Sequence, residues 1–162
     1  MWSLLILFSY SISLCMNGES NLPVILAVQQ GEFVIPVDTV SPDKHGCVRF
    51  EGNIPLEAGQ YVFVQSNRRL FNFLISDPGE VMLSFSARLE DGRTLEVQAE
   101  GSEENNAYMR FNRFLQENYG RANEILEQGH DPKQALADVE RLEATIRDYS
   151  TFLALEYKGY ML

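Results

Sequence analysis

The segment EVMLSFSARLEDGRTLEVQAE (residues 80–100) indicates the fold of this chain more clearly than any other. Apolar and polar side chains alternate over Glu80–Ser86 and again over Thr94–Glu100, the period of a strand with one buried face. Asp91-Gly92 lies between these segments, and this dipeptide favours the tight turn of a β-hairpin. The stretch therefore predicts two antiparallel strands joined by a short turn.

Shorter segments of the same kind come before this hairpin, each separated from the next by turn-forming residues. One clear turn is Ser41–Gly46, which contains proline, aspartate and glycine. The earlier strands are expected within residues 22–28, 33–38, 47–51, 61–65 and 70–75. About seven or eight short strands at this spacing predict an antiparallel β-sandwich or a partly open barrel.

The last third of the chain has helical periodicity instead. Ser102 is a suitable N-cap, and Asp131-Pro132 begins a second helix. Gly129 is expected to cap the first helix, and Gly120 to bend it or end it early. The two apolar stripes comprise Tyr108, Phe111, Leu115, Tyr119, Ala122 and Leu126, then Leu136, Val139, Leu142, Ile146, Tyr149 and Leu153.

These patterns predict an α+β protein with three segments. Residues 1–20 are expected to be a signal peptide or lipoprotein signal. Residues 21–101 are expected to form the β-rich domain. Residues 102–162 are expected to form a helical hairpin that packs on the β domain or extends from it, since two helices joined by a short loop pack antiparallel.

The N-terminal segment differs in composition from the rest. Residues 2–14 are mostly apolar, no charge precedes Glu19, and the run is too short to span a bilayer. An apolar stretch followed by small residues such as Ser11 and Ser13 is typical of an export signal. Cys15 has two interpretations: an ordinary residue of the removed segment, which we favour, or a lipid-modified cysteine.

The overall composition excludes several classes of function. The chain has 162 residues, 45% of them hydrophobic, and a net charge of -10. A nucleic-acid binder usually carries a basic surplus, which is missing here. Two cysteines are too few for a disulfide-rich scaffold, a four-cysteine zinc site or an iron–sulfur cluster.

No catalytic signature is present in the sequence. Cys47 stands alone, without a CxxC motif, and is interpreted as a small strand residue. His45 and His130 both lie at loop edges without a partner histidine. We therefore expect no catalytic residue, no cofactor-binding residue and no metal ligand, and we expect the chain not to be an enzyme.

Five aromatic residues fall on the expected strands. They are Tyr61, Phe63, Phe71, Phe73 and Phe85. Aromatic rings usually supply core area, so the favoured interpretation is that they fill the core. The alternative is a stacking platform for a sugar or a peptide.

Three stretches, in this order, carry a family resemblance. They are residues 37–52, residues 55–61, and Gly101-Ser102-Glu103-Glu104-Asn105 opening a helix that contains Phe111 and Phe114-Leu115. Together they resemble the uncharacterised N-terminal domain that precedes the thioredoxin-like domain in envelope thiol-disulfide oxidoreductases of Bacteroidota. The similarity runs from about Leu22 to the end of the chain.

The resemblance implies a non-catalytic accessory domain, periplasmic or anchored at the outer membrane of a Gram-negative cell. The catalytic cysteines of that family lie in a CxxC motif that no position here matches. The chain is then either truncated before a redox domain or a stand-alone accessory module. Its expected partners are the thioredoxin-like domain, another protein or a second copy, and a membrane only through a lipid on Cys15. The alternative function is a stand-alone envelope module that binds a glycan or peptide through the aromatic residues of the sheet.

Overall fold

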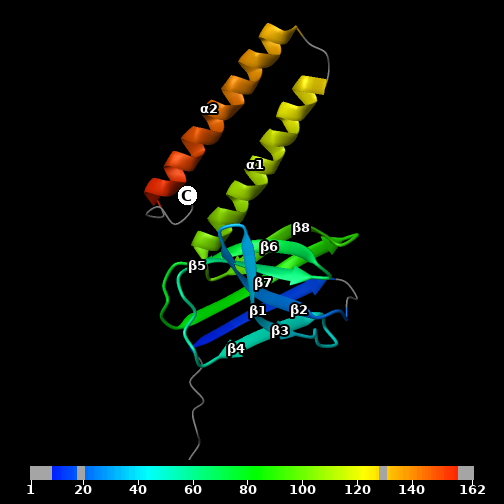
Figure 1. The fold of residues 1–162 in the computed structure, drawn as a ribbon, viewed down its shortest axis with the longest axis vertical. Coiled ribbons are helices and arrows are strands. Elements are labelled where there is room, and N and C mark those ends of the chain that lie inside the picture. The colour runs from blue at the N-terminus through cyan, green and yellow to red at the C-terminus, as the bar shows by residue number, and fades with distance from the viewer. Residues whose placement is uncertain (1–8, 18–20, 128–130, 157–162) are drawn as a thin grey trace, which may run out of the picture. The chain divides into compact units, whose positions relative to one another are not determined.

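Two four-stranded sheets make up the N-terminal part of the chain in the computed structural model, which describes residues 9–17, 21–127 and 131–156 (Figure 1). Sheet A has the strand order β4-β1-β7-β8, and sheet B has the order β3-β2-β5-β6. The strands are β1 (Tyr10–Asn17), β2 (Val24–Gln30), β3 (Phe33–Val40), β4 (Cys47–Gly52), β5 (Gly59–Gln65), β6 (Arg68–Ile75), β7 (Val81–Glu90) and β8 (Arg93–Glu100).

The two sheets are open, so the expected sandwich is confirmed and the alternative of a partly open barrel is not formed. Neighbouring strands pair antiparallel, except that β1 and β7 run parallel. The expected hairpin joins β7 and β8, and Asp91 and Gly92 both have positive φ angles (49° and 71°), as its turn requires.

A group of phenylalanine rings joins the sheets. Phe50 and Phe85 come from sheet A, and Phe63, Phe71 and Phe73 come from sheet B. The ring of Phe63 lies 5.8 Å from those of Phe50 and Phe85, and 4.9 Å from that of Phe73, between ring centroids. We call these five rings the phenylalanine cluster. It fills the space between the sheets, so the prediction that these strand aromatics build the core is confirmed.

Strand β1 corrects the sequence-based division of the chain. Tyr10–Asn17 is not part of a leader separate from the fold, because it lies inside sheet A between β4 and β7. Ile12 and Leu14 are 0% exposed, and the strand alternates buried apolar residues with small polar ones. The β-sandwich therefore begins before residue 21, whereas residues 1–8 and 18–20 lie outside the described part.

The pairing of Tyr10 with Gly52 shows how closely β1 fits its neighbour. These residues are directly opposite each other in the β1–β4 ladder, and a Cβ on Gly52 would overlap the ring of Tyr10. A glycine at this position lets the tyrosine ring lie against the backbone of β4.

The first turn of helix α1 (Glu103–Glu127) also belongs to the sandwich unit, which extends to Asn106. Ser102 accepts a hydrogen bond from the Asn105 N–H (3.3 Å), so the expected N-cap is confirmed. Asn105, 1% exposed, bonds through its side-chain amide to both backbone polar groups of Leu74 on β6. Asn106 does the same to Ala99 on β8. Two adjacent asparagines thus satisfy the backbone hydrogen-bonding groups of one residue on an edge strand of each sheet.

The second unit, Ala107–Leu162, contains most of α1 together with α2 (Pro132–Glu156). Ala107 and Phe111 form its buried core, and Tyr149 of α2 packs edge-on against Phe111 and Phe114, with ring centroids 5.7 and 4.8 Å apart. The two ends of the hairpin that meet are the start of α1 and the end of α2, which confirms antiparallel packing. Neither helix is long and apolar enough to cross a membrane.

Some details of the helices differ from expectation. Helix α1 continues through Gly120, so the early end is wrong. Tyr119 and Leu136 are 60% and 59% exposed, so these two positions of the expected stripes do not join a core. The capping role of Gly129 falls on residues that the structure does not describe. The expected packing of the hairpin against the β domain stays a prediction.

Replacing the central ring of the phenylalanine cluster tests the sandwich core. Phe63→Ala should lower the free energy of unfolding of the β-sandwich by about 3–5 kcal/mol, because the large cavity touches rings from both sheets. Phe33→Ala is the matched control, since Phe33 is 76% exposed, and should change it by less than about 0.5 kcal/mol. If urea titrations gave the two variants equal losses of unfolding free energy, Phe63 would not be a core residue.

Candidate functional site

A disulfide links Cys15 on β1 to Cys47 at the start of β4. The two residues are directly opposite each other in the ladder, with Cα atoms 4.0 Å apart. The Met16 N–H donates to the Gly46 carbonyl (3.0 Å), so the cysteines occupy a pair that exchanges no backbone hydrogen bonds of its own. Side chains are closest at such pairs, which allows the bond to form directly across the strands.

This bond corrects both interpretations of the cysteines. Cys47 is not a lone, plain strand residue, and Cys15 is not an ordinary residue of a removed segment. Lipid attachment to Cys15 is also excluded in this state, because its sulfur is bonded to that of Cys47. The sequence contained a signal for strand β1, though not for its partners: Tyr10, Ile12, Leu14 and Met16 alternate with smaller or more polar residues, as in a half-buried strand.

The turn before Cys47 is held by Asp43. Its carboxylate accepts hydrogen bonds from the backbone N–H groups of Cys47 (3.0 Å) and His45 (2.8 Å). Its backbone N–H donates to the Cys47 carbonyl (2.8 Å). These bonds, Cys47 first, hold the pKa of Asp43 below its usual value of 3.8. These hydrogen bonds therefore hold the backbone of Cys47 in place.

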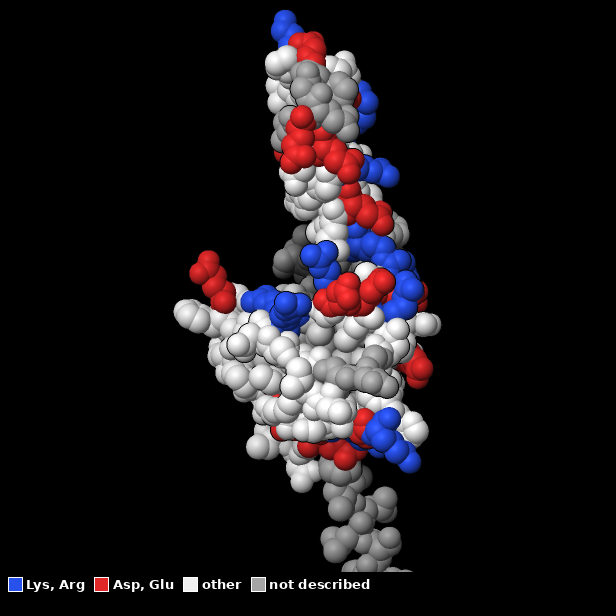
Figure 2. All heavy atoms as spheres, turned by 90° about the vertical axis from the view of Figure 1, so that its right-hand side faces the viewer, with Lys and Arg blue, Asp and Glu red and all other residues white. Residues whose placement is uncertain are grey.

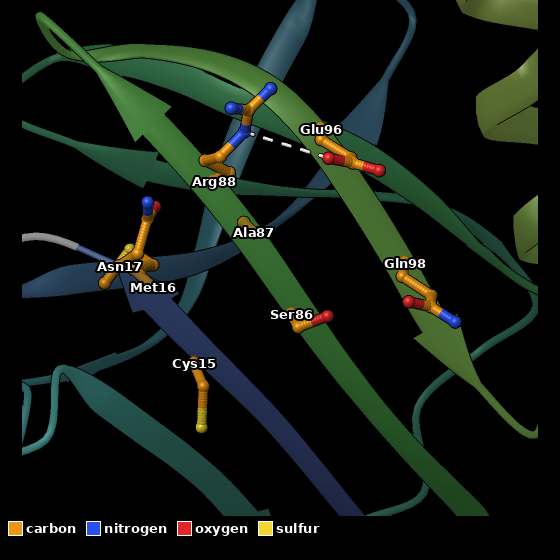
Figure 3. A pocket seen from close by; sticks show the side chains of 8 residues that line it. All are labelled: Cys15, Met16, Asn17, Ser86, Ala87, Arg88, Glu96 and Gln98. Atoms are coloured by element: carbon orange, nitrogen blue, oxygen red, sulfur yellow. Dashed lines mark ion pairs between the residues drawn. The ribbon is translucent and has the colours of Figure 1, made fainter.

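An open depression of about 480 Å³ lies beside Cys15 on the outer face of sheet A (Figure 3). Its walls come from β1, β7 and β8: Cys15, Met16, Asn17, Ser86, Ala87, Arg88, Glu96 and Gln98. Arg88 of β7 and Glu96 of β8, which are register partners, form an ion pair of 3.7 Å, and both side chains are about 60% exposed. Such a pair contributes little stability. Of these eight residues, Cys15 carries the group with covalent reactivity, its disulfide sulfur.

His45 does not join this site. His45 is exposed on the Asp43 turn, and His130 lies outside the described residues. Within residues 9–17, 21–127 and 131–156, no three side chains of His, Cys, Asp or Glu are grouped so that they could hold a metal ion.

The alternative interpretation of the strand aromatics, a stacking platform, does not agree with their burial. Tyr61, Phe63 and Phe73 are between 0% and 3% exposed, so a sugar or peptide cannot stack on them. Burial, followed by the Glu57 carboxylate, raises the pKa of Tyr61 above 10.0, and its hydroxyl donates to the Glu57 carbonyl (3.0 Å). These rings therefore serve the fold.

Comparison with known families and with curated proteins gives no match to any family model or to any curated protein. The chain is therefore defined here by its architecture: an α+β protein with a β-sandwich, a cross-strand disulfide and a helical hairpin.

The contribution of the disulfide to stability can be measured directly. Replacing both cysteines (Cys15→Ser with Cys47→Ser) should lower the free energy of unfolding by about 3–4 kcal/mol, because the bond closes a loop across a sequence separation of 32. Urea titration of the oxidised protein and of the double variant provides the comparison. Two free thiols per chain in the native, air-oxidised protein would contradict the bond.

The Asp43 turn should make stability depend on pH in the acid range. Because the folded pKa is lowered, the contribution of Asp43 is complete above about pH 4 and is lost as the pH falls through the lowered value. The difference in unfolding free energy between wild type and Asp43→Ala should therefore shrink on acidification. A difference that stays constant down to pH 2 would show that the carboxylate is not bonded in this way.

Proposed function

We propose that this chain is a non-catalytic interaction module of an exported protein, and that it docks a protein partner through strand β3. The observation that carries the proposal is the set of exposed apolar side chains on this strand. Phe33, Ile35 and Val37 are 76%, 43% and 37% exposed. Large apolar side chains gathered on one exposed strand are typical of a surface that a partner covers.

The position of β3 adds to this argument. It is one of the two edge strands of sheet B and pairs only with β2 within that sheet. Unpaired edges invite contact with other proteins. Pro36 has no N–H and interrupts the edge, which favours docking through the apolar side chains over addition of a long strand. On the face drawn in Figure 2, charged side chains border an area in which the described atoms are uncharged.

The family resemblance suggests the class of partner. Domains that resemble this chain precede a thioredoxin-like domain, so a thioredoxin-like domain is the partner we propose. The disulfide supports an oxidising compartment such as the periplasm, because disulfides persist there and are rare in the cytosol. The alternative glycan or peptide module loses its expected binding rings, which are buried.

Binding of a purified thioredoxin-like domain with an intact CxxC motif tests this proposal. Phe33→Ser should weaken the complex by about tenfold or more, as expected when an apolar anchor is truncated. Leu95→Ser, on edge strand β8 and 42% exposed, is the matched control and should bind as the wild type does. Calorimetric titration supplies both affinities. A wild-type chain that does not bind the domain, or a Phe33 variant that binds equally well, would overturn the proposal.

A further inference from the structure

The disulfide lies on the solvent side of its sheet. Cys15 is exposed and Cys47 is partly buried, whereas the neighbours of Cys15 on β1, Leu14 and Met16, are 0% and 5% exposed. The alternation of the strand places these two in the core and the sulfur of Cys15 outside it. The bond is therefore in contact with solvent and does not reinforce the interior between the sheets.

The strand order decides from which side this bond can be attacked. A thiolate displaces one sulfur of a disulfide along the line of the S–S bond, opposite to the sulfur that leaves. Cys47 lies on β4, on one side of β1, so an attack on Cys15 must come from the other side, over β7. The open depression occupies this side, and Ser86 of β7 is the register partner of Cys15 there (Figure 3).

We infer that Cys15–Cys47 is a thiol–disulfide exchange site that accepts electrons from a dithiol entering the depression over Ser86. One thiolate of the dithiol bonds to Sγ of Cys15, the S–S bond breaks, and Cys47 leaves as a thiolate that takes a proton from water. The second thiol of the dithiol loses its proton and attacks the mixed disulfide at the sulfur of its own molecule. Cys15 then leaves as a thiolate and is protonated. The dithiol becomes a disulfide, and two electrons have reduced Cys15 and Cys47 to thiols.

This site is separate from the docking strand of the proposed function. It lies on sheet A, whereas β3 belongs to sheet B, and a small dithiol needs no docking surface. The two proposals therefore have different readouts: affinity for a thioredoxin-like domain for the docking strand, and the rate of reduction by dithiothreitol for the disulfide. Failure of either proposal can be recognised without the other.

The rate at which dithiothreitol reduces the folded, oxidised chain tests the inference, with thiols counted by alkylation and mass spectrometry. The rate should rise in proportion to the dithiothreitol concentration. Ser86→Trp should slow it by about tenfold, because the indole fills the line of approach and access controls exchange. Met82→Trp is the matched control: Met82 is on the same face of β7 and is 64% exposed, but its register partner is Ser11, and this variant should react within about twofold of wild type.

A second measurement uses the unmodified chain, so it does not depend on the folding of a variant. A thioredoxin-type protein whose second active-site cysteine is replaced by serine has one attacking thiol and stops at the mixed disulfide. Peptide mapping should find it attached to Cys15. A reduction rate independent of dithiothreitol, an unchanged rate for the Ser86 variant, or attachment to Cys47 would each overturn the inference.

Discussion

The contact of phenylalanine rings from two sheets is the interaction on which the rest of this structure depends. Phe63 of β5 meets Phe50 and Phe85 of sheet A at 5.8 Å between ring centroids, and Phe73 of β6 meets Phe85 at 4.9 Å. Each sheet thus buries its apolar face against rings from the other. Burial of aromatic area on this scale is the main favourable term in folding such a sandwich. Once these rings face inward, alternation sets the direction of the neighbouring side chains up to the register shifts in the β5–β6 and β7–β8 pairs.

The elements that the sequence predicts well are those with local causes. The β7–β8 hairpin follows from alternation and from Asp91-Gly92, whose positive φ angles few other residue pairs tolerate. Helix α1 begins where Ser102 caps it, and α2 begins after Asp131, whose carbonyl accepts from Ala135 at 3.0 Å. The expected core aromatics follow from the same alternation, because the rings share the inner face of their strands.

The features that sequence reasoning missed depend on distant pairing. Strand β1 pairs with β4 and β7, so its partners lie up to about seventy residues away and no local pattern encodes them. Its apolar composition also matches that of an export signal. This composition favoured a leader, although the alternation within Tyr10–Asn17 is that of a strand. The disulfide was missed for the same reason, since assigning Cys15 to a leader left Cys47 without a partner. Tyr119 and Leu136 are exposed for a different reason. Helical periodicity predicts an apolar stripe, but the stripe can be longer than the surface that covers it.

Which alternate side chains of a strand are buried in the core also decides which ones form the surface of the sandwich. A shift of β1 by one residue would turn Leu14 outward and bury Cys15, so the register that buries Ile12 and Leu14 also exposes the sulfur. Ser11 and Ser13 share the outer face with Cys15, and a solvated serine face can stay uncovered at little cost. Strand β3 is the opposite case, because its exposed apolar residues at the edge of sheet B gain stability only when another surface covers them. The fold therefore separates a polar face, which holds the disulfide, from an edge strand with exposed apolar residues.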